Sequence, residues 1–278
     1  NQSLLQFMRP ASERTISVLS EVADFVDDRK FASNWMIIEH EGWTLPATKE
    51  KHDWCGMWRT FGCLNAELHE ILGKGRRHYI KQFQRSCYRA LCKECFLKWI
   101  ARQSNKSTKR IEKYAHDSGK SAVHLMVMVP NSQHDLPFVL IKKRMMEILK
   151  TAKWDGGSVV FHPFKFNHST RQWYYSPHFH LVGFGDEKNI AQAYGKYGWF
   201  LKLGEERRSI FQTFCYILSH CGIKKGIHTM TWIGNLSYSK LHVEKEPKIT
   251  NCPVCGAEFV EVYYEGLFHP IVPPDKPY

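Results

Sequence analysis

The sequence predicts an α+β fold built on an antiparallel sheet, and three observations support this prediction. Short runs of β-branched and aromatic residues recur in the second half of the chain, as in SAVHLMVMVP (121–130) and GSVVFHPFKF (157–166). Amphipathic stretches with helical spacing lie between such runs. Two runs are joined only by the polar segment NHSTRQ, which is the pattern of an antiparallel hairpin.

The predicted elements follow the order β-α-β-β-α-β-α-β. The first strand is SAVHLMVMVP, and the hairpin joins 157–166 to WYYSPHFHLVGFG (173–185). Helices are predicted over HDLPFVLIKKRMMEILKTAKW, EKNIAQAYG and EERRSIFQTFCYILSHCGI, with further strands over YGWFLKL and a strand pair around TMTWIGNLSYSKL. This order describes a sheet of ferredoxin-like type with helices packed against one face.

Four regions differ in composition. Residues 1–50 are predicted to form a helical N-terminal lead, and residues 51–120 form a basic, cysteine-rich, zinc-binding insert. Residues 121–245 contain the sheet and the candidate catalytic residues, and residues 246–278 form a C-terminal tail with a CxxC pair. No run of about 18 apolar residues is present to span a bilayer, and the start lacks a secretory layout. We therefore expect a cytoplasmic protein with no membrane partner.

The positive charge is concentrated in one part of the chain. The formal net charge is +12, and thirteen Lys and Arg side chains face only two Glu between Lys74 and Lys113. Aromatic residues are interleaved with them, a pattern expected of a surface that neutralises phosphates and stacks on bases. A solvated cationic helix face is the alternative. The predicted DNA contacts are Arg76, Arg77, Lys81, Arg85 and Arg89.

Histidines at alternate positions of one strand predict a metal site. His178 and His180 project from the same face of the second hairpin strand, about 6–7 Å apart along the chain. A hairpin register that pairs positions summing to 340 would place His162 directly across from His178, on the same face. Three imidazoles would then converge on one ion, although a register change of one residue would turn His162 away.

A tyrosine is the candidate nucleophile. On the predicted helix around FQTFCYILSHCGI, Tyr216 lies off the apolar stripe, and His220 lies one turn further on the same face. His220 is placed to ligate the ion or to orient the phenol. A phenol can attack phosphorus when a cation polarises the phosphate.

The nine cysteines favour metal ligands over disulfides in a reducing compartment. The first choice for a structural zinc site is the set Cys63, Cys87, Cys92 and Cys95, with Cys55 or His69 as substitutes. Cys252 and Cys255 form a second possible zinc knuckle, which either takes a ligand from elsewhere, such as Cys55 or a histidine, or stays metal-free.

These motifs resemble a known superfamily. SPHFHLVGFG is similar to the histidine-hydrophobic-histidine (HUH) motif, and TFCYILSHCGI is similar to the tyrosine motif that supplies the nucleophile in the same superfamily. HLMVMVP (124–130) is a loose match to the first family strand. With CGMWRTFGC and SCYRALCKEC upstream and WIGNLSYSKL downstream, the chain resembles rolling-circle replication initiators (Rep) of archaeal plasmids and viruses.

The resemblance implies that residues 121–245 are an HUH endonuclease core that nicks single-stranded or hairpin origin DNA. Mn²⁺ or Mg²⁺ would be held by His178, His180 and a third ligand, for which His162 is favoured and His220 is the alternate. Tyr216 would form a 5′-phosphotyrosine link and leave a 3′-OH for a host polymerase. Because the sequence lacks a Walker-type motif, a helicase would be a separate chain.

Other functions compete with this expectation. Relaxases and transposases use the same histidine pair and tyrosine. A non-catalytic, zinc-dependent regulator that binds nucleic acid would explain the basic block and the cysteines but would give Tyr216 no role. A phosphodiesterase that uses water would need the metal ion but would survive the loss of Tyr216.

Overall fold

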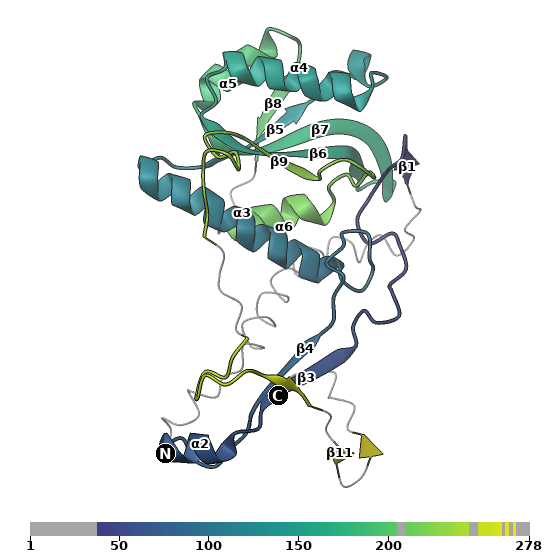
Figure 1. Cartoon of the computed structure of the whole chain (residues 1–278). Helices are drawn as coiled ribbons and strands as arrows, with labels where there is room; N and C mark the ends of the chain where they lie inside the picture. Colours follow the sequence, from purple (N-terminus) through teal and green to yellow (C-terminus); the bar gives the residue numbers. More distant parts are fainter. Residues whose placement is uncertain (1–37, 205–208, 245–249, 263–264, 267–268, 271–278) are drawn as a thin grey trace. The chain divides into compact units, whose positions relative to one another are not determined.

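The computed structural model describes residues 38–204, 209–244, 250–262, 265–266 and 269–270, and Figure 1 shows their elements. These residues belong to two compact units. The small unit contains residues 51–87 and the described residues from 244 onward. The sheet unit contains residues 38–50 and the described residues of 88–243.

A five-stranded antiparallel sheet, in the order β8-β5-β7-β6-β9, is the centre of the sheet unit. Its strands are β5 (Val123–Met128), β6 (Gly156–Asn167), β7 (Gln172–Phe184), β8 (Phe200–Leu203) and β9 (Met230–Gly234). Its helices are α3 (Phe96–Ser118), α4 (Phe138–Thr151), α5 (Glu187–Gly195) and α6 (Ile210–Ser219). The hairpin of β1 (Glu39–His40) and β2 (Trp43–Thr44) and the 3-10 turn η3 (Asn131–Gln133) complete the unit.

The order of elements from β5 to β9 confirms the α+β prediction and the predicted alternation of strands and helices. One detail differs at the end of the unit. TMTWIGNLSYSKL forms one strand, β9, followed by turns, where a strand pair was predicted.

A bulge sets the register of the β6–β7 hairpin. If the register next to the turn continued, His162 would lie opposite Pro177. The register shifts by one residue at Pro163, so His162 faces His178 instead. Prolines are tolerated at bulges because no ladder hydrogen bond is needed there. The predicted pairing of His162 with His178 is therefore confirmed, and the bulge at Pro163 produces it.

Helices cover both faces of the sheet. Val127, Phe179 and Leu181 lie in one apolar core with residues of α4 and α5. On the other face the Phe214 ring of α6 lies 6.1 Å from the Trp232 ring of β9. Figure 1 shows α3 and α6 on the side of the sheet opposite α4 and α5. The expectation of helices on one face thus holds for α4 and α5 but is wrong for α3 and α6.

The small unit is a three-stranded antiparallel sheet in the order β10-β3-β4. Its strands are β3 (Trp58–Cys63), β4 (Tyr79–Gln84) and β10 (Val260–Glu261), and its helix is α2 (Ala66–Ile71). A two-stranded pair of β11 (Glu265–Gly266) and β12 (His269–Pro270) follows along the chain.

The two units differ from the predicted regions. Residues 88–120 group with the sheet instead of with the insert, and the C-terminal segment groups with residues 51–87. Most of the predicted helical lead, residues 1–37, lies outside the described residues. No helix in the described ranges combines the length and the apolar character needed to cross a membrane.

Candidate active site and metal centres

Three histidines converge on the face of the sheet that α6 covers. His162 comes from β6, His180 from β7, and His220 is the residue that caps the C-terminal end of α6. One ring nitrogen of each lies within 4.8 Å of the others. The His162 ring centroid is 4.2 Å from that of His180 and 4.6 Å from that of His220. The group could therefore hold a metal ion through three imidazole ligands.

Burial keeps the rings of His162 and His180 in the neutral form, which is the form that can bind a metal ion. It lowers the pKa of His162 and of His180 well below the ordinary histidine value, so both are neutral at pH 7. Both ring nitrogens of His162 and Nε2 of His180 are buried without a hydrogen-bond partner among the described residues. The nearby Ile217 backbone acts to raise the pKa of His162, but this effect is smaller than the lowering by burial, and the two groups do not form a hydrogen bond. Unsatisfied buried nitrogens are rare, and a bound cation would satisfy them.

His178 lies beside this group. Its ring centroid is 5.1 Å from that of His162, but its ring nitrogens fall outside the set of three. Nδ1 of His178 donates a hydrogen bond of 2.8 Å to the Ser176 carbonyl, which leaves Nε2 with the lone pair. Burial lowers the pKa of His178 to about 4. The structure thus groups His180 with both candidates for the third ligand, His162 and His220, and places His178 next to them.

A fifth histidine, which the sequence analysis missed, contacts the group from β5. Nε2 of His124 is 2.8 Å from Nδ1 of His180, so one ring donates a hydrogen bond to the other. A hydrogen bond on one nitrogen fixes the direction of the other, and such contacts orient metal ligands. The signal in the sequence was the alternation in HLMVM, which places His124 and Met126 on one face, with Met126 opposite His180.

Tyr216 lies against the histidines. Its ring centroid is 4.7 Å from that of His220 and 6.4 Å from that of His180. The neighbouring α6 side chains Cys215 and Ile217 are buried, whereas Tyr216 is half-buried, so its ring is accessible. The predicted placement of the tyrosine on the face that also presents His220 is confirmed.

The cysteines form two groups, and neither is the predicted set. Cys55, Cys87, Cys92 and Cys95 form one group, and Cys63, His69, Cys252 and Cys255 form the other. In each group all ligand atoms lie within 4.8 Å of one another. Both have the residue types and the number of ligands of a structural zinc site. The predicted substitutes, Cys55 and His69, therefore each belong to one of the two candidate groups, and Cys63 lies apart from Cys87, Cys92 and Cys95.

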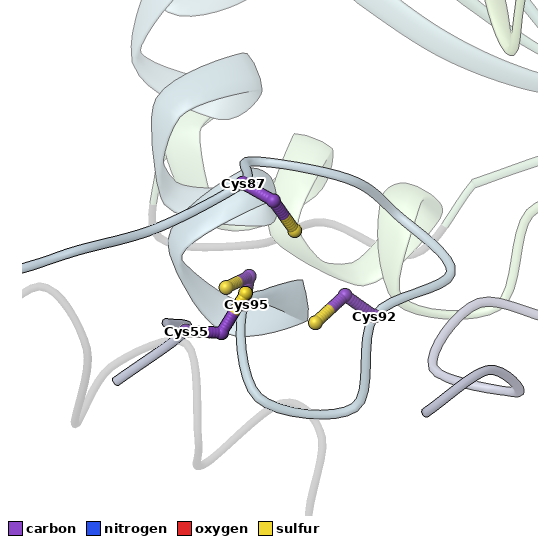
Figure 2. A group of neighbouring side chains, drawn as sticks. All are labelled: Cys55, Cys87, Cys92 and Cys95. Atoms are coloured by element: carbon purple, nitrogen blue, oxygen red, sulfur yellow. The ribbon is translucent and has the colours of Figure 1, made fainter. Parts of the chain in front are cut away.

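Figure 2 shows the four sulfur atoms of the first group turned toward a common space. Cys92 and Cys95 form a tight turn, in which the Cys92 carbonyl accepts a hydrogen bond of 3.0 Å from the Phe96 N–H. Cys95 is the N-cap residue directly before α3. Four cysteines leave no open position on a tetrahedral zinc ion, so this group could hold zinc in a structural role.

His69 lies at the centre of the second group. Its Nε2 lies 3.5 Å from Sγ of Cys63, 3.4 Å from Sγ of Cys252 and 3.3 Å from Sγ of Cys255. Ligand atoms of a tetrahedral zinc site lie roughly 3.5–3.8 Å apart, given metal bonds of about 2.0–2.3 Å. Two of these ligands, Cys63 and His69, are therefore the partners that the C-terminal CxxC needs.

The predicted DNA contacts fall in both units. Arg76 and Arg77 lie in an exposed turn after α2, and Lys81 lies on β4. The Arg85 guanidinium lies 5.1 Å from the Trp54 ring centroid. Arg89 belongs to the sheet unit.

The basic block also contains a structural cation. The Arg110 side chain of α3 is buried and donates hydrogen bonds to the carbonyls of Leu236, at 2.9 Å, and Leu241, at 2.8 Å. It lies 4.5 Å from the Tyr238 ring centroid. Arg110 thus holds the turns after β9 and is not a solvated charge.

Comparisons of the chain with protein-family models, with curated proteins and with solved structures give no match. The functional argument therefore depends on the residues themselves.

Proposed function

We propose that the protein is a metal-dependent endonuclease of HUH type that nicks single-stranded or hairpin DNA through Tyr216 and initiates rolling-circle replication. The observation that supports this most strongly is the position of the Tyr216 ring, 4.7 Å from His220 and 6.4 Å from His180, at the edge of the buried histidine group. A nucleophile beside a metal site is the arrangement that cleavage of a phosphodiester through a covalent intermediate requires.

The topology also favours this assignment. The strand order β8-β5-β7-β6, with α4 and α5 on one face, is consistent with the β-α-β-β-α-β unit of ferredoxin-like type that we propose for this sheet. The resemblance to HUH enzymes rests on a histidine pair followed by a tyrosine on a downstream helix. Here His178 and His180 lie on β7, which has β5 and β6 as neighbours, and Tyr216 lies on α6.

The roles of the residues follow from their positions. His162, His180 and His220 would hold the divalent ion, which when bound draws electron density from a non-bridging phosphate oxygen. The Tyr216 oxygen attacks phosphorus and forms the phosphotyrosine bond, while the bond from phosphorus to the 3′-oxygen breaks. The phenolic proton leaves to solvent, and the departing 3′-oxygen takes a proton from water. A host polymerase can then extend the free 3′-OH.

The ligand type favours Mn²⁺ over Mg²⁺. Mg²⁺ prefers oxygen ligands and retains its water molecules, whereas the group offers three imidazole nitrogens. We therefore expect cleavage to be faster with Mn²⁺ than with Mg²⁺ at equal concentration.

The test is a cleavage assay with Mn²⁺ and a pool of labelled single strands and hairpins. The wild-type protein should give a protein–DNA band that survives boiling in SDS, and Tyr216→Phe should give none. Tyr197→Phe is the matched control, because Tyr197 is a 51% exposed tyrosine of the same unit. Cleavage that persists in Tyr216→Phe would assign the nucleophile to water, if no protein–DNA band forms, or to another tyrosine, if the band remains.

Two alternatives give different results in the same assay. A relaxase or transposase would form the same adduct but on other DNA sequences, so the cleaved members of the pool distinguish these enzymes from an initiator. A non-catalytic zinc-dependent regulator would bind the pool and cleave none of it.

A further inference from the structure

The small unit presents a basic turn that its metal centre anchors at both ends. Residues 72–78, LGKGRRH, follow α2 and are exposed along their whole length. At one end the Lys74 N–H donates a hydrogen bond of 2.9 Å to the His69 carbonyl. At the other end Nδ1 of His69 donates one of 2.5 Å to the Arg77 carbonyl. The same ring directs Nε2 at the three cysteine sulfurs. One metal ligand therefore fixes the shape of the turn.

The turn leads directly into a strand with exposed aromatic rings. Tyr79, Lys81 and Phe83 alternate along β4 and share one face of the β10-β3-β4 sheet. Tyr79 is 37% exposed and Phe83 is 40% exposed. The two rings lie about 13 Å apart along the strand, far enough to contact separate bases.

Each exposed ring is supported by a second aromatic residue. Phe83 stacks on Phe61 of β3, with ring centroids 5.4 Å apart and planes at 12°. Tyr79 stacks on Phe259, with centroids 5.6 Å apart and planes at 22°. Stacked neighbours hold the two exposed rings in fixed orientations, so little side-chain entropy is lost when a ligand stacks on them.

We propose that this face, formed by Tyr79, Lys81, Phe83 and the basic turn 74–78, binds single-stranded DNA at a site separate from the histidine group. The turn supplies Lys74, Arg76 and Arg77 for phosphates, and the rings supply planar surfaces for bases. Duplex DNA would offer phosphates but no open base faces, so the aromatic component selects single strands. The choice of DNA as partner rests on the proposed nicking function, and the site would hold the strand that is cleaved.

The test measures binding of the full chain carrying Tyr216→Phe to a labelled single strand of about 12 nucleotides, without added Mn²⁺. Tyr79→Ala and Phe83→Ala should each weaken binding about tenfold, whereas Tyr79→Phe and Phe83→Tyr should retain it. Arg76→Gln and Arg77→Gln should each reduce the slope of log affinity against log salt by about 0.7. Tyr197→Ala removes an exposed ring from the other unit and should change nothing.

Two further variants test the anchor. His69→Cys keeps four zinc ligands but lacks the hydrogen bond to Arg77, so zinc content should be retained while binding weakens severalfold and the salt slope falls. Zinc content also shows whether the aromatic variants remain folded. Phe61→Leu should weaken binding without removing an exposed ring, because it removes the support of Phe83.

The outcomes separate this inference from the proposed function. If the alanine variants bind as tightly as the parent while the wild-type chain cleaves DNA, the inference is wrong and the nicking function stands. If the variants lose binding but the wild-type chain never cleaves, the surface stands and the nicking function fails. Equal affinity for single strands and duplex, unaffected by Tyr79→Ala, would also overturn the inference, because stacking would then contribute nothing.

Discussion

The two units bury different kinds of side chain. In the sheet unit the buried side chains form a continuous apolar core around β5, β6, β7, α4 and α5. In the described part of the small unit, four of the six buried side chains belong to the metal groups; the six are Cys55, Thr60, Cys63, Ala66, His69 and Cys252. Hydrophobic burial can therefore stabilise the sheet unit, whereas candidate zinc ligands make up most of what the described part of the small unit buries.

Exposed apolar side chains occur in both units: Ile71 of α2 is 80% exposed in the small unit, and Phe200 of β8 is 72% exposed in the sheet unit. The contrast between the units therefore lies in what each of them buries. The chain thus has two kinds of candidate metal site: cysteine-rich groups that could hold zinc in a structural role, and a histidine group whose proposed role is chemical.

Of the changes considered, removal of zinc should have the largest effect on the fold. If the small unit kept its structure without zinc, the difference between the two units would not hold. Structural zinc contributes about 10–16 kcal/mol in small zinc-dependent domains. A strong chelator should therefore abolish amide-exchange protection in β3, β4 and α2, while β5, β6 and β7 keep theirs. Hydrogen exchange read by mass spectrometry resolves both sets in one sample. Equal loss of protection in both sheets would show that the small unit does not depend on zinc more than the sheet unit does.

A matched pair of substitutions sharpens the comparison. His69→Leu removes a ligand of the small unit, and loss of zinc and of β3–β4 protection should follow. His162→Leu replaces a buried imidazole whose nitrogens have no hydrogen-bond partner among the described residues, so the melting temperature should change little or rise. Calorimetry and zinc analysis of both variants measure this difference. A His162→Leu protein that unfolds would show that the histidine group is structural.

The same His162→Leu variant should fold but lose DNA cleavage. Loss of a metal ligand should reduce Mn²⁺-dependent cleavage more than about 100-fold, which exceeds the usual cost of losing an outer-shell partner. His168→Leu is the control, because His168 lies exposed in the turn between β6 and β7. Unchanged cleavage in His162→Leu would exclude His162 as a ligand.

Replacement of His124 should have a smaller effect of the same kind. His124 contacts His180 and is not a member of the histidine group, so His124→Leu should weaken Mn²⁺ binding about 10–100-fold and leave the fold intact. Titration of Mn²⁺ against cleavage rate gives the apparent affinity. If excess Mn²⁺ does not restore the rate, His124 acts on something other than the ion.

The smallest expected effect tests the packing of the sheet unit. Arg110→Met removes two hydrogen bonds from a buried cation to the carbonyls of Leu236 and Leu241, and should cost about 2–4 kcal/mol in the free energy of unfolding. Lys106→Met, at an exposed position of the same helix, is the control. Urea unfolding monitored by tryptophan fluorescence compares the two. Equal costs would show that the charge of Arg110 has no structural role.

Local patterns made much of the sheet unit predictable. Alternation and helical spacing gave the order of elements from β5 to β9, and the period of two along a strand placed His178 and His180 on one face. The sequence did not reveal the bulge at Pro163. The alternation of side chains along a strand does not encode the packing that shifts the register by one residue.

The zinc ligands were harder to assign because their partners are distant in sequence. Cys63 and Cys255 are 192 positions apart, yet their sulfurs lie 3.5 Å from each other. A nearby CxxC identifies two ligands of a site, but the remaining two depend on how the chain folds back. His124 was missed for the same reason, since its role depends on the pairing of β5 with β7.

The most direct test of the nicking function is to locate the covalent bond. The protein should be incubated with Mn²⁺ and a cleaved strand, digested with trypsin, and analysed by mass spectrometry for a peptide that carries a nucleotide. The account predicts that the modification lies on Tyr216, within the α6 peptide, and that it is absent in His162→Leu. A nucleotide attached to another residue, or cleavage with no attached nucleotide, would contradict it.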